Sequence, residues 1–494
     1  MMGCINFIGV QHKYGRAVML TAVKFLLPME NQLPDIQLLP SRKGGSVLIV
    51  NNHVLHVNFT KQQRKYWKCR EANCKVTAIT DNGELVKLNG AHTHPPDKSA
   101  AVMRQRKHDA SVLARQHPTM PMKRVYEQAF GDVNLEDEQE VAHLPSLKSL
   151  SSTLYRSRAK RLPNLPHTRA DINLQGEWAS TQDDREFILA NDGNEDKMII
   201  FGTVQNLRLL CEAETIFMDG TFKVTPEMFS QVYSIHVMKM GIMVPVCVAL
   251  LPQKNHETYS RFFHLLLEVA VRYGFRFDPR IVCIDFESAV IATITEMFPN
   301  ARIRGCLFHY SQAIWRKVQN LGLSGRYTVD DAFNRLVRRA AALPLVPREQ
   351  VDEVWLEAMN EVIDEDATRF TDYMTTTWVD NLSARFPVEM WTHDDNIEGQ
   401  RTNNHLEGWH STLNKALSRP HPNIYQFIEM LKSEQRNFET QLRILQAGGA
   451  PPVQRAKARR VTDRLVRLRQ RLTNNDITVH QYAGFVGAIL KLHD

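Results

Sequence analysis

Three acidic residues of the chain are candidates for a metal site that performs phosphoryl transfer. Asp219 lies in the strand-like segment 215–224, and Asp285 ends an apolar run that begins at Ile281. A carboxylate at the end of a buried strand is costly unless it is paired or binds a cation. Two hard oxygen ligands suit Mg²⁺ or Mn²⁺ better than zinc. A metal pair needs a third carboxylate, for which Glu407 is the candidate, although among 54 acidic residues such a triple is weak evidence by itself.

A second set of residues has the softer ligand types that zinc prefers. Cys69 and Cys74 are separated by four residues, and His92 and His94 follow after seventeen more. Two thiolates and two imidazoles in this order are typical of a tetrahedral zinc site. The two histidines are closer together than in common zinc fingers, but on an extended segment residues i and i+2 point to the same side. The spacing therefore predicts one zinc ion.

Four further residues could form a second zinc site beside Glu407. Cys306 ends an expected strand and His309 lies in the first turn of the next helix, while His405 and His410 flank Glu407 in the sequence. The alternative is a buried cysteine and hydrogen-bonded histidines, which are commoner than ligands.

The elements expected around the acids alternate in type. Three strands, at 215–224, 231–240 and 244–251, precede a helix at 257–273 whose apolar residues recur at helical spacing. Strands at 281–285 and 301–306 then alternate with helices at 287–298 and 309–320. This order predicts an α/β fold with a mixed sheet flanked by helices, the layout of a ribonuclease H-like fold.

In such a sheet the first and fourth strands are neighbours. Asp219 and Asp285, 66 positions apart, would then meet in one site. Glu287, two residues after Asp285, is expected to stabilise the N-terminus of its helix instead of binding metal.

We expect five parts along the chain, since 494 residues exceed a single compact core. A small β-rich zinc-finger domain has expected strands at 45–50, 54–59 and 65–69. A helical insertion at about 322–400, with helices at 330–342 and 348–362, interrupts the catalytic domain. The parts are an unassigned segment 1–40, the finger 41–97, a linker with helices 98–175, the catalytic domain 176–447 and a basic helical segment 448–494.

Positive charge is concentrated near the C-terminus. The segment from Arg455 to Arg471 contains eight Arg or Lys residues and one acid, Asp463. Its net charge of +7 equals that of the whole chain. Val461, Leu465, Leu468 and Leu472 recur at helical spacing, so the segment is expected to form an amphipathic helix with a cationic face. That face could follow a phosphate backbone, or it could be a solvated face on a helix that packs elsewhere or dimerises.

Composition narrows the class of protein. Apolar content of 43% and charged content of 23% are typical of a folded protein. The apolar stretch 17–28 is interrupted by Lys24 and too short to cross a bilayer, so no membrane partner is expected. Seven cysteines fit a reducing compartment, and the basic cluster 156–161 could be a nuclear-import signal or plain surface.

The N-terminal pattern resembles a FLYWCH-type zinc finger, which implies binding of DNA or protein partners. The resemblance rests on Phe59, Tyr66, Trp67, Cys69, Cys74, His92 and His94. The leucine that belongs to the FLYWCH signature is not clear in this sequence.

The region 215–415 resembles Mutator-like element (MULE) transposases. The first stretch of matching residues is Asp219 to Lys223, and the match continues at Pro226, Phe229, Gln231, Tyr233, Pro245, Leu250, Leu251, Lys254 and Tyr259. Three later matching stretches are 285–287, Gly305 to His309 and 403–410. The resemblance implies that Asp219, Asp285 and Glu407 hold the catalytic metals and that a mostly helical insertion fills the 121 residues between the last two acids. It also implies cleavage of element ends, strand transfer to target DNA, a nuclear location and a homo-oligomer that joins two ends.

Two alternatives remain at this point. A host-adopted, non-catalytic DNA-binding regulator would keep the acids without cutting DNA. A structure-specific nuclease would cut without strand transfer.

Overall fold

A computed structural model describes residues 34–40, 45–118, 120–380, 382–397, 399, 404–417, 420–451, 456–490 and 492. Most of the unassigned segment 1–40, Asn403 of the transposase-like stretch 403–410 and Arg455 of the basic segment lie outside these residues. The described residues form two compact units. One contains the residues up to Asp109 together with Asp132–Leu144, and the other contains Ala110–Gly131 and Pro145 onward.

An antiparallel sheet of six strands forms most of the first unit, and the strands lie in chain order. The three strands expected from the sequence are present, and β1, β5 and β6 are additional. Trp67 is buried at the centre of the sheet, where its Nε1 donates a hydrogen bond to Thr80 Oγ1 at 2.9 Å. The strands are β1 (Ile36–Pro40), β2 (Ser46–Val50), β3 (His53–Lys61), β4 (Arg64–Cys69), β5 (Thr77–Asp81) and β6 (Glu84–Asn89).

Helices follow this sheet. The long helix α1 (Lys98–Gln116) begins among the residues of the first unit and ends among those of the second. The short helix α3 (Glu138–His143) belongs to the first unit, and α2 (Met122–Phe130) and α4 (Leu147–Ala159) belong to the second.

The second unit contains a mixed sheet of seven strands in the order β13-β12-β9-β10-β11-β8-β7. The central strands β9, β10 and β11 are antiparallel to one another, while β12 pairs in parallel with β9, and β13 in parallel with β12. The mixed α/β sheet is therefore confirmed. The strands are β7 (Ile188–Asp192), β8 (Met198–Phe201), β9 (Thr215–Thr221), β10 (Gln231–Lys239), β11 (Ile242–Leu251), β12 (Ile281–Ile284) and β13 (Arg302–Gly305).

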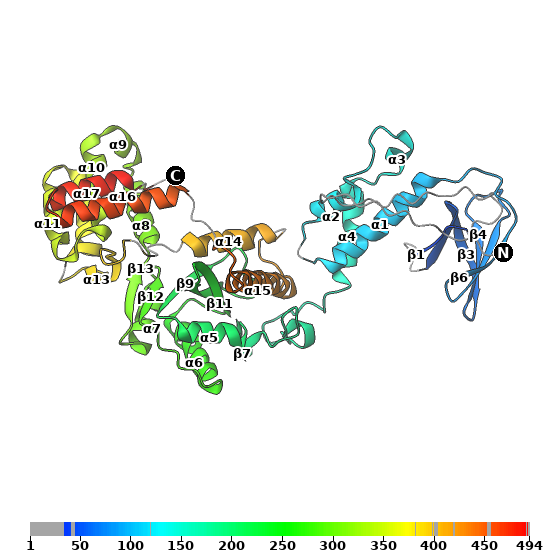
Figure 1. The fold of residues 1–494 in the computed structure, drawn as a ribbon, viewed down its shortest axis with the longest axis horizontal. Coiled ribbons are helices and arrows are strands. Elements are labelled where there is room, and N and C mark those ends of the chain that lie inside the picture. The colour runs from blue at the N-terminus through cyan, green and yellow to red at the C-terminus, as the bar shows by residue number, and fades with distance from the viewer. Residues whose placement is uncertain are drawn as a thin grey trace, which may run out of the picture. The chain divides into compact units, whose positions relative to one another are not determined.

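Helices cover both faces of this sheet (Figure 1). Alternate residues of the strands, such as Ile200 and Ile199, enter two different apolar clusters, as expected for strands buried on both faces. On one face pack α5 (Val204–Glu212), α6 (His256–Arg272) and α7 (Ser288–Met297). On the other face pack α14 (Asn404–Ala416) and α15 (Ile424–Gln446).

A helical part lies between β13 and α14 in the sequence, as predicted. The expected helix at 330–342 is α10, which Asp330 caps by accepting hydrogen bonds from the N–H groups of Ala332 and Phe333. The other helices are α8 (Leu307–Asn320), α9 (Ser324–Val329), α10 (Asp331–Ala342), α11 (Val351–Asn360), α12 (Glu365–Met374) and α13 (Val388–Trp391).

The C-terminal helices α16 (Ala456–Thr473) and α17 (Val479–Ile489) return to this helical part. They share an apolar cluster with Ala342 and Leu345 of the insertion, and Gly487 lies so close to α10 that a Cβ there would be 2.8 Å from Arg338 O. Among the described residues, no helix combines the length and the apolar character needed to cross a membrane.

Candidate metal sites

The four predicted zinc ligands converge in the first unit. Cys69 is the last residue of β4, and Cys74, His92 and His94 lie in the turns that follow β4 and β6. Cys69 Sγ is 3.2 Å from His94 Nε2, and Cys74 Sγ is 3.3 Å from His92 Nδ1. All four ligand atoms lie within 4.8 Å of one another. Two sulfur and two nitrogen atoms gathered around one point fit tetrahedral zinc.

The protonation of these groups also suits zinc. Burial, with His53 and His94 nearby, lowers the pKa of His92 to about 4, so its imidazole is neutral. His94 Nδ1 lies 3.0 Å from Pro95 O, a carbonyl that can only accept, so Nδ1 carries the hydrogen and Nε2 is free to face Cys69. Burial opposes ionisation of Cys74, but hydrogen bonds from the backbone of Val76 and Thr93 and from Cys69 and His94 outweigh it and lower the pKa to about 7.

A fifth residue of this site, His53, was not predicted. It is the first residue of β3, and its ring stacks on His92 with centroids 3.6 Å apart and lies edge-on to His94 at 4.9 Å. Because no spacing rule connects a residue at position 53 with a ligand at 92, only the folded sheet reveals this contact.

In the second unit, sheet register brings Asp219 and Asp285 together. The last paired residues of the parallel strands are Phe217 on β9 and Cys283 on β12, and each aspartate follows its residue by two positions. Both carboxylates are therefore at the same end of adjacent strands. Asp219 is only 7% exposed. The next residue, Gly220, leaves room for the Gln231 side chain, because a Cβ added to Gly220 would lie 2.7 Å from Gln231 Oε1.

Phe286 fixes the loop that carries Asp285. A Cβ on Gly305 would be 2.4 Å from the Phe286 ring, so only glycine permits this ring position. The same ring packs edge-on against Trp378, with centroids 4.8 Å apart, and against Phe386 at 5.0 Å. The insertion thus supports the loop beside the acidic site.

Glu407 joins the aspartates from α14, a helix that contacts β9. Burial first, and then the negative charges of Asp285 and Glu407, raise the pKa of Asp219 to about 7. Burial also raises the pKa of Asp285 and of Glu407. The effect of both partners on Asp219 shows that the three acids share one electrostatic environment.

Two predicted histidines lie among these acids. His410 Nδ1 is 3.5 Å from Asp219 Oδ2, and His309 Nε2 is 3.9 Å from Glu407 Oε1. Burial lowers the pKa of each histidine to about 4, so neither compensates the negative charge. A cleft of about 470 Å³ opens over this group and is lined by Asp219, Gly220, Lys223, His309, Glu407, His410, Ser411, Asn414 and Lys415.

Lys254 is a cation at the acidic site that residue types alone did not single out. Its charge lowers the pKa of both Asp219 and Asp285. Lys254 Nζ is 3.6 Å from Glu287 Oε2, and Tyr259 donates to Glu287 Oε1 at 3.0 Å. Glu287 is the N-cap residue of α7 and its side chain makes no hydrogen bond to the helix N-terminus, so its expected effect on the helix through charge stays a prediction. The side-chain partners of Glu287 are Lys254 and Tyr259.

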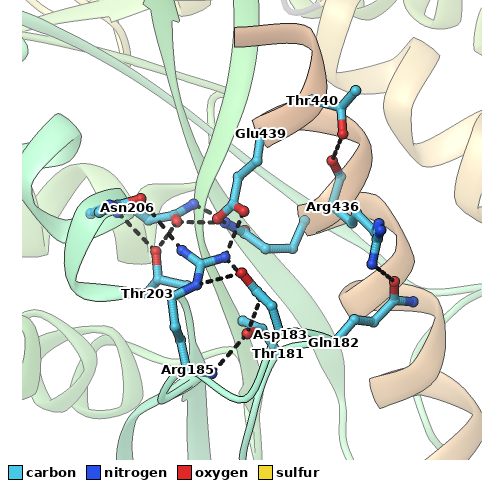
Figure 2. Close-up of polar contacts among 11 residues, drawn as sticks. Thr181, Gln182, Asp183, Arg185, Thr203, Asn206, Arg436, Glu439 and Thr440 are labelled. Carbon is cyan, nitrogen blue, oxygen red and sulfur yellow. Dashed lines mark hydrogen bonds and ion pairs between the residues drawn. The ribbon is translucent and has the colours of Figure 1, made fainter. Parts of the chain in front are cut away.

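The helix that carries Glu407 is held by its neighbour α15. Trp409 Nε1 donates to Glu434 Oε2 at 3.1 Å, which ties α14 to α15. Arg185 and Glu439, shown in Figure 2, fix α15 in turn: Arg185 donates to Glu439 Oε2 at 2.6 Å. Asn206 Nδ2 donates to Gln435 Oε1 at 3.1 Å. These contacts connect residues more than 200 positions apart, so the position of Glu407 depends on the whole second unit.

The residues of the predicted second zinc site are placed differently from those of the finger. Cys306 is buried at the N-cap of α8, and His405 is exposed in the first turn of α14. His309 and His410 contact the acids, as described above. Among the described residues, the ligands grouped closely enough to hold a metal ion are those of the finger. The second zinc site stays a prediction.

Two family models match the chain. The model of the MULE transposase domain matches residues 215–313, and the model of the FLYWCH zinc finger domain matches residues 38–94. The first match includes Asp219 and Asp285 and ends before Glu407; the second includes all four Cys/His residues of the finger. Both resemblances drawn from the sequence are confirmed, and the two domains together suggest DNA binding. No curated protein matches the chain.

Proposed function

We propose that this chain, which combines a FLYWCH zinc finger with a MULE transposase domain, is a DNA transposase of the Mutator-like class. The observation that carries the proposal is that Asp219 and Glu407 line one cleft, while Asp285 follows the strand beside that of Asp219 and raises its pKa. Metal-dependent cleavage of DNA ends and strand transfer would occur there.

The strand order supports a ribonuclease H-like catalytic domain. Three antiparallel strands, β9 to β11, are extended on the β9 side by the parallel strands β12 and β13. We further propose the division into finger, linker, catalytic domain with helical insertion and basic C-terminal segment that the sequence indicates.

The acids suit Mg²⁺ or Mn²⁺. Three carboxylates with raised pKa values are crowded beside two neutral histidines, so a bound cation would relieve their repulsion. When bound by Asp219, Asp285 and Glu407, such ions supply activation of water or a DNA 3′-hydroxyl and stabilisation of the leaving oxygen.

The neighbouring lysines provide the complementary charge for DNA. Lys223 and Lys415 line the cleft, where an ammonium group can bind a phosphate. Lys254, held by Glu287, lies beside the aspartates and would bind the phosphate that reacts. The zinc finger would contribute to recognition of element ends. A nuclear location and a homo-oligomer that joins two ends complete the proposal.

An end-cleavage assay tests it. The substrate is a DNA duplex with the terminal inverted repeat that flanks the coding region, and Mg²⁺ or Mn²⁺ is added. Asp285→Asn should lower cleavage at least about a thousandfold, since this carboxylate would hold the metal, and leave DNA binding intact. The control is Asp278→Asn, a half-exposed acid paired with Arg276. Equal cleavage by Asp285→Asn and parent would refute the site, and cleavage without strand transfer would identify a nuclease.

One observation favours a second candidate, a host-adopted, non-catalytic DNA-binding transcriptional regulator derived from such a transposase. In the described part of the chain, the residues grouped closely enough to hold a metal ion are those of the finger, and the acids of the cleft are not among them. The regulator predicts DNA binding by parent and Asp285→Asn alike with no cleavage by either. Long terminal inverted repeats around the coding region favour the transposase.

A further inference from the structure

The basic helix α16 uses its apolar face within the chain. Leu465 is buried, and Val461, Leu468 and Leu472 pack beside it, as their spacing predicts. Their partners include Ala342 of α10 and Tyr482 and Val486 of α17. This face is therefore occupied, and a helix fixed in this way presents its remaining side chains in a defined arrangement.

Four arginines of α16 form one exposed row. Arg460, Arg464, Arg467 and Arg471 follow one another at spacings of four, three and four residues, and all four are exposed. At 3.6 residues per turn their Cα positions fall within about 60° around the helix axis and extend over about 16 Å. We call these four residues the arginine row.

The acids near α16 are engaged elsewhere. Asp394 lies 4.0 Å from Arg469, a residue outside the row, and Asp395 pairs with Arg302 and Arg304. Glu353 and Glu357 both contact His480. Among the described residues, no acid forms an ion pair with a member of the row, and Asp463 is the one acid within α16 itself.

We infer that the arginine row of α16 binds the phosphate backbone of duplex DNA. Arg471 also lies over the Phe485 ring, 5.8 Å from its centroid, which leaves its guanidinium without an acidic partner among the described residues. Guanidinium groups on a fixed helix that form no ion pair with a described acid match a regular line of phosphates, to which arginine can donate two parallel hydrogen bonds. Contacts of this kind position a protein on DNA without reading its sequence. An acidic protein segment offers no comparable regular row of charge. The inference does not require cleavage, because it concerns binding alone.

The salt dependence of binding tests the inference. The full chain is titrated without Mg²⁺ or Mn²⁺ against a fluorescent duplex of arbitrary sequence at a series of NaCl concentrations. Each lost phosphate contact should reduce the slope of log K against log[salt] by about 0.9. Replacing all four arginines of the row by glutamine should therefore reduce the slope by about 3 to 4. The double variants Arg460→Gln/Arg464→Gln and Arg467→Gln/Arg471→Gln should each give about half of this change, which keeps the test valid if the fourfold variant does not fold.

A matched variant controls for total charge. It carries arginine-to-glutamine changes at four exposed positions outside α16, namely Arg124, Arg272, Arg335 and Arg369. The slope of log K against log[salt] should be the same in this control as in the parent. An unchanged slope in the α16 variants, or an equal loss in the control, would overturn the inference. Competition by poly-glutamate as strong as that by duplex DNA would assign the row to an acidic protein partner instead.

Discussion

The zinc-finger site and the acidic site gather their residues by different routes. The four finger ligands come from 26 consecutive residues, Cys69 to His94, and their atoms lie within 4.8 Å of one another. The three acids span 189 residues, and a strand, a strand end and a helix of the second unit bring them together. The first site needs mainly local folding, whereas the second needs the complete sheet and α15.

The two sites also differ in charge. The finger pairs two cysteine sulfurs with two imidazoles, of which that of His92 is neutral, and zinc completes a set that is already compact. The acidic site concentrates carboxylates that repel one another, so burial and repulsion raise the pKa of Asp219 to about 7. Metal binding should therefore drive folding of the finger. At the acidic site it should instead reduce the repulsion between carboxylates in a domain that is already folded.

The largest expected effect is loss of the finger fold in Cys74→Ser. A structural zinc site contributes about 10 kcal/mol or more to folding, so the variant should lose zinc and the protection of its sheet. Hydrogen exchange should become fast in residues 45–94 and stay slow in 215–313. The control is Cys211→Ser, a change in α5 away from the ligands.

Zinc content measured on the same proteins sharpens the result. The parent should hold zinc at the finger, and Cys74→Ser should hold none there. One remaining zinc ion per chain in Cys74→Ser would establish the second site predicted at Cys306, His309, His405 and His410. Slow exchange of 45–94 without zinc would contradict the local origin of the finger site.

The next effect is a pH dependence of the acidic site in metal-free protein. The pKa of Asp219 is raised from 3.8 to about 7, so between these pH values the folded state binds more protons than the unfolded state. The contribution of Asp219 to stability should therefore fall as pH rises through this window, by up to about 4 kcal/mol. In thermal unfolding experiments from pH 4 to 8, the stability of Asp219→Asn relative to the parent should rise by most of this amount, and added Mg²⁺ should reduce the difference. Equal pH dependence of the parent and Asp219→Asn would contradict the crowding of the acids.

The smallest effect concerns the support of α15. Arg185→Met leaves Glu439 and Asp183 without their cation and should destabilise the second unit by about 1–2 kcal/mol. The matched change Arg208→Met breaks an exposed pair with Glu212 and should cost at most about 0.5 kcal/mol. Thermal unfolding of the two variants measures the difference. Equal midpoints would show that the contacts in Figure 2 do not hold α15.

Much of the fold could be predicted because its signals are local. The apolar run before Asp285 identified β12, and the residues before Ala342 identified α10. The strands β1, β5 and β6 were missed. For β6 the reason is that only one of its residues is partly buried, so it lacks the alternation that marks a half-buried strand. The contacts of Glu287 with Lys254 and Tyr259 were not predicted, because these partners lie about 30 positions earlier.

The sequence by itself determined the ligand types, the zinc quartet and the amphipathic character of α16, because residue chemistry and short spacing are enough for each. Tertiary structure decided which acids meet, that Lys254 is held beside them by Glu287, and that His53 stacks on a zinc ligand. It also decided that the apolar face of α16 is buried, which leaves its arginines exposed. Parallel pairing of β12 with β9 joins segments 66 positions apart, and no local spacing encodes such a pairing.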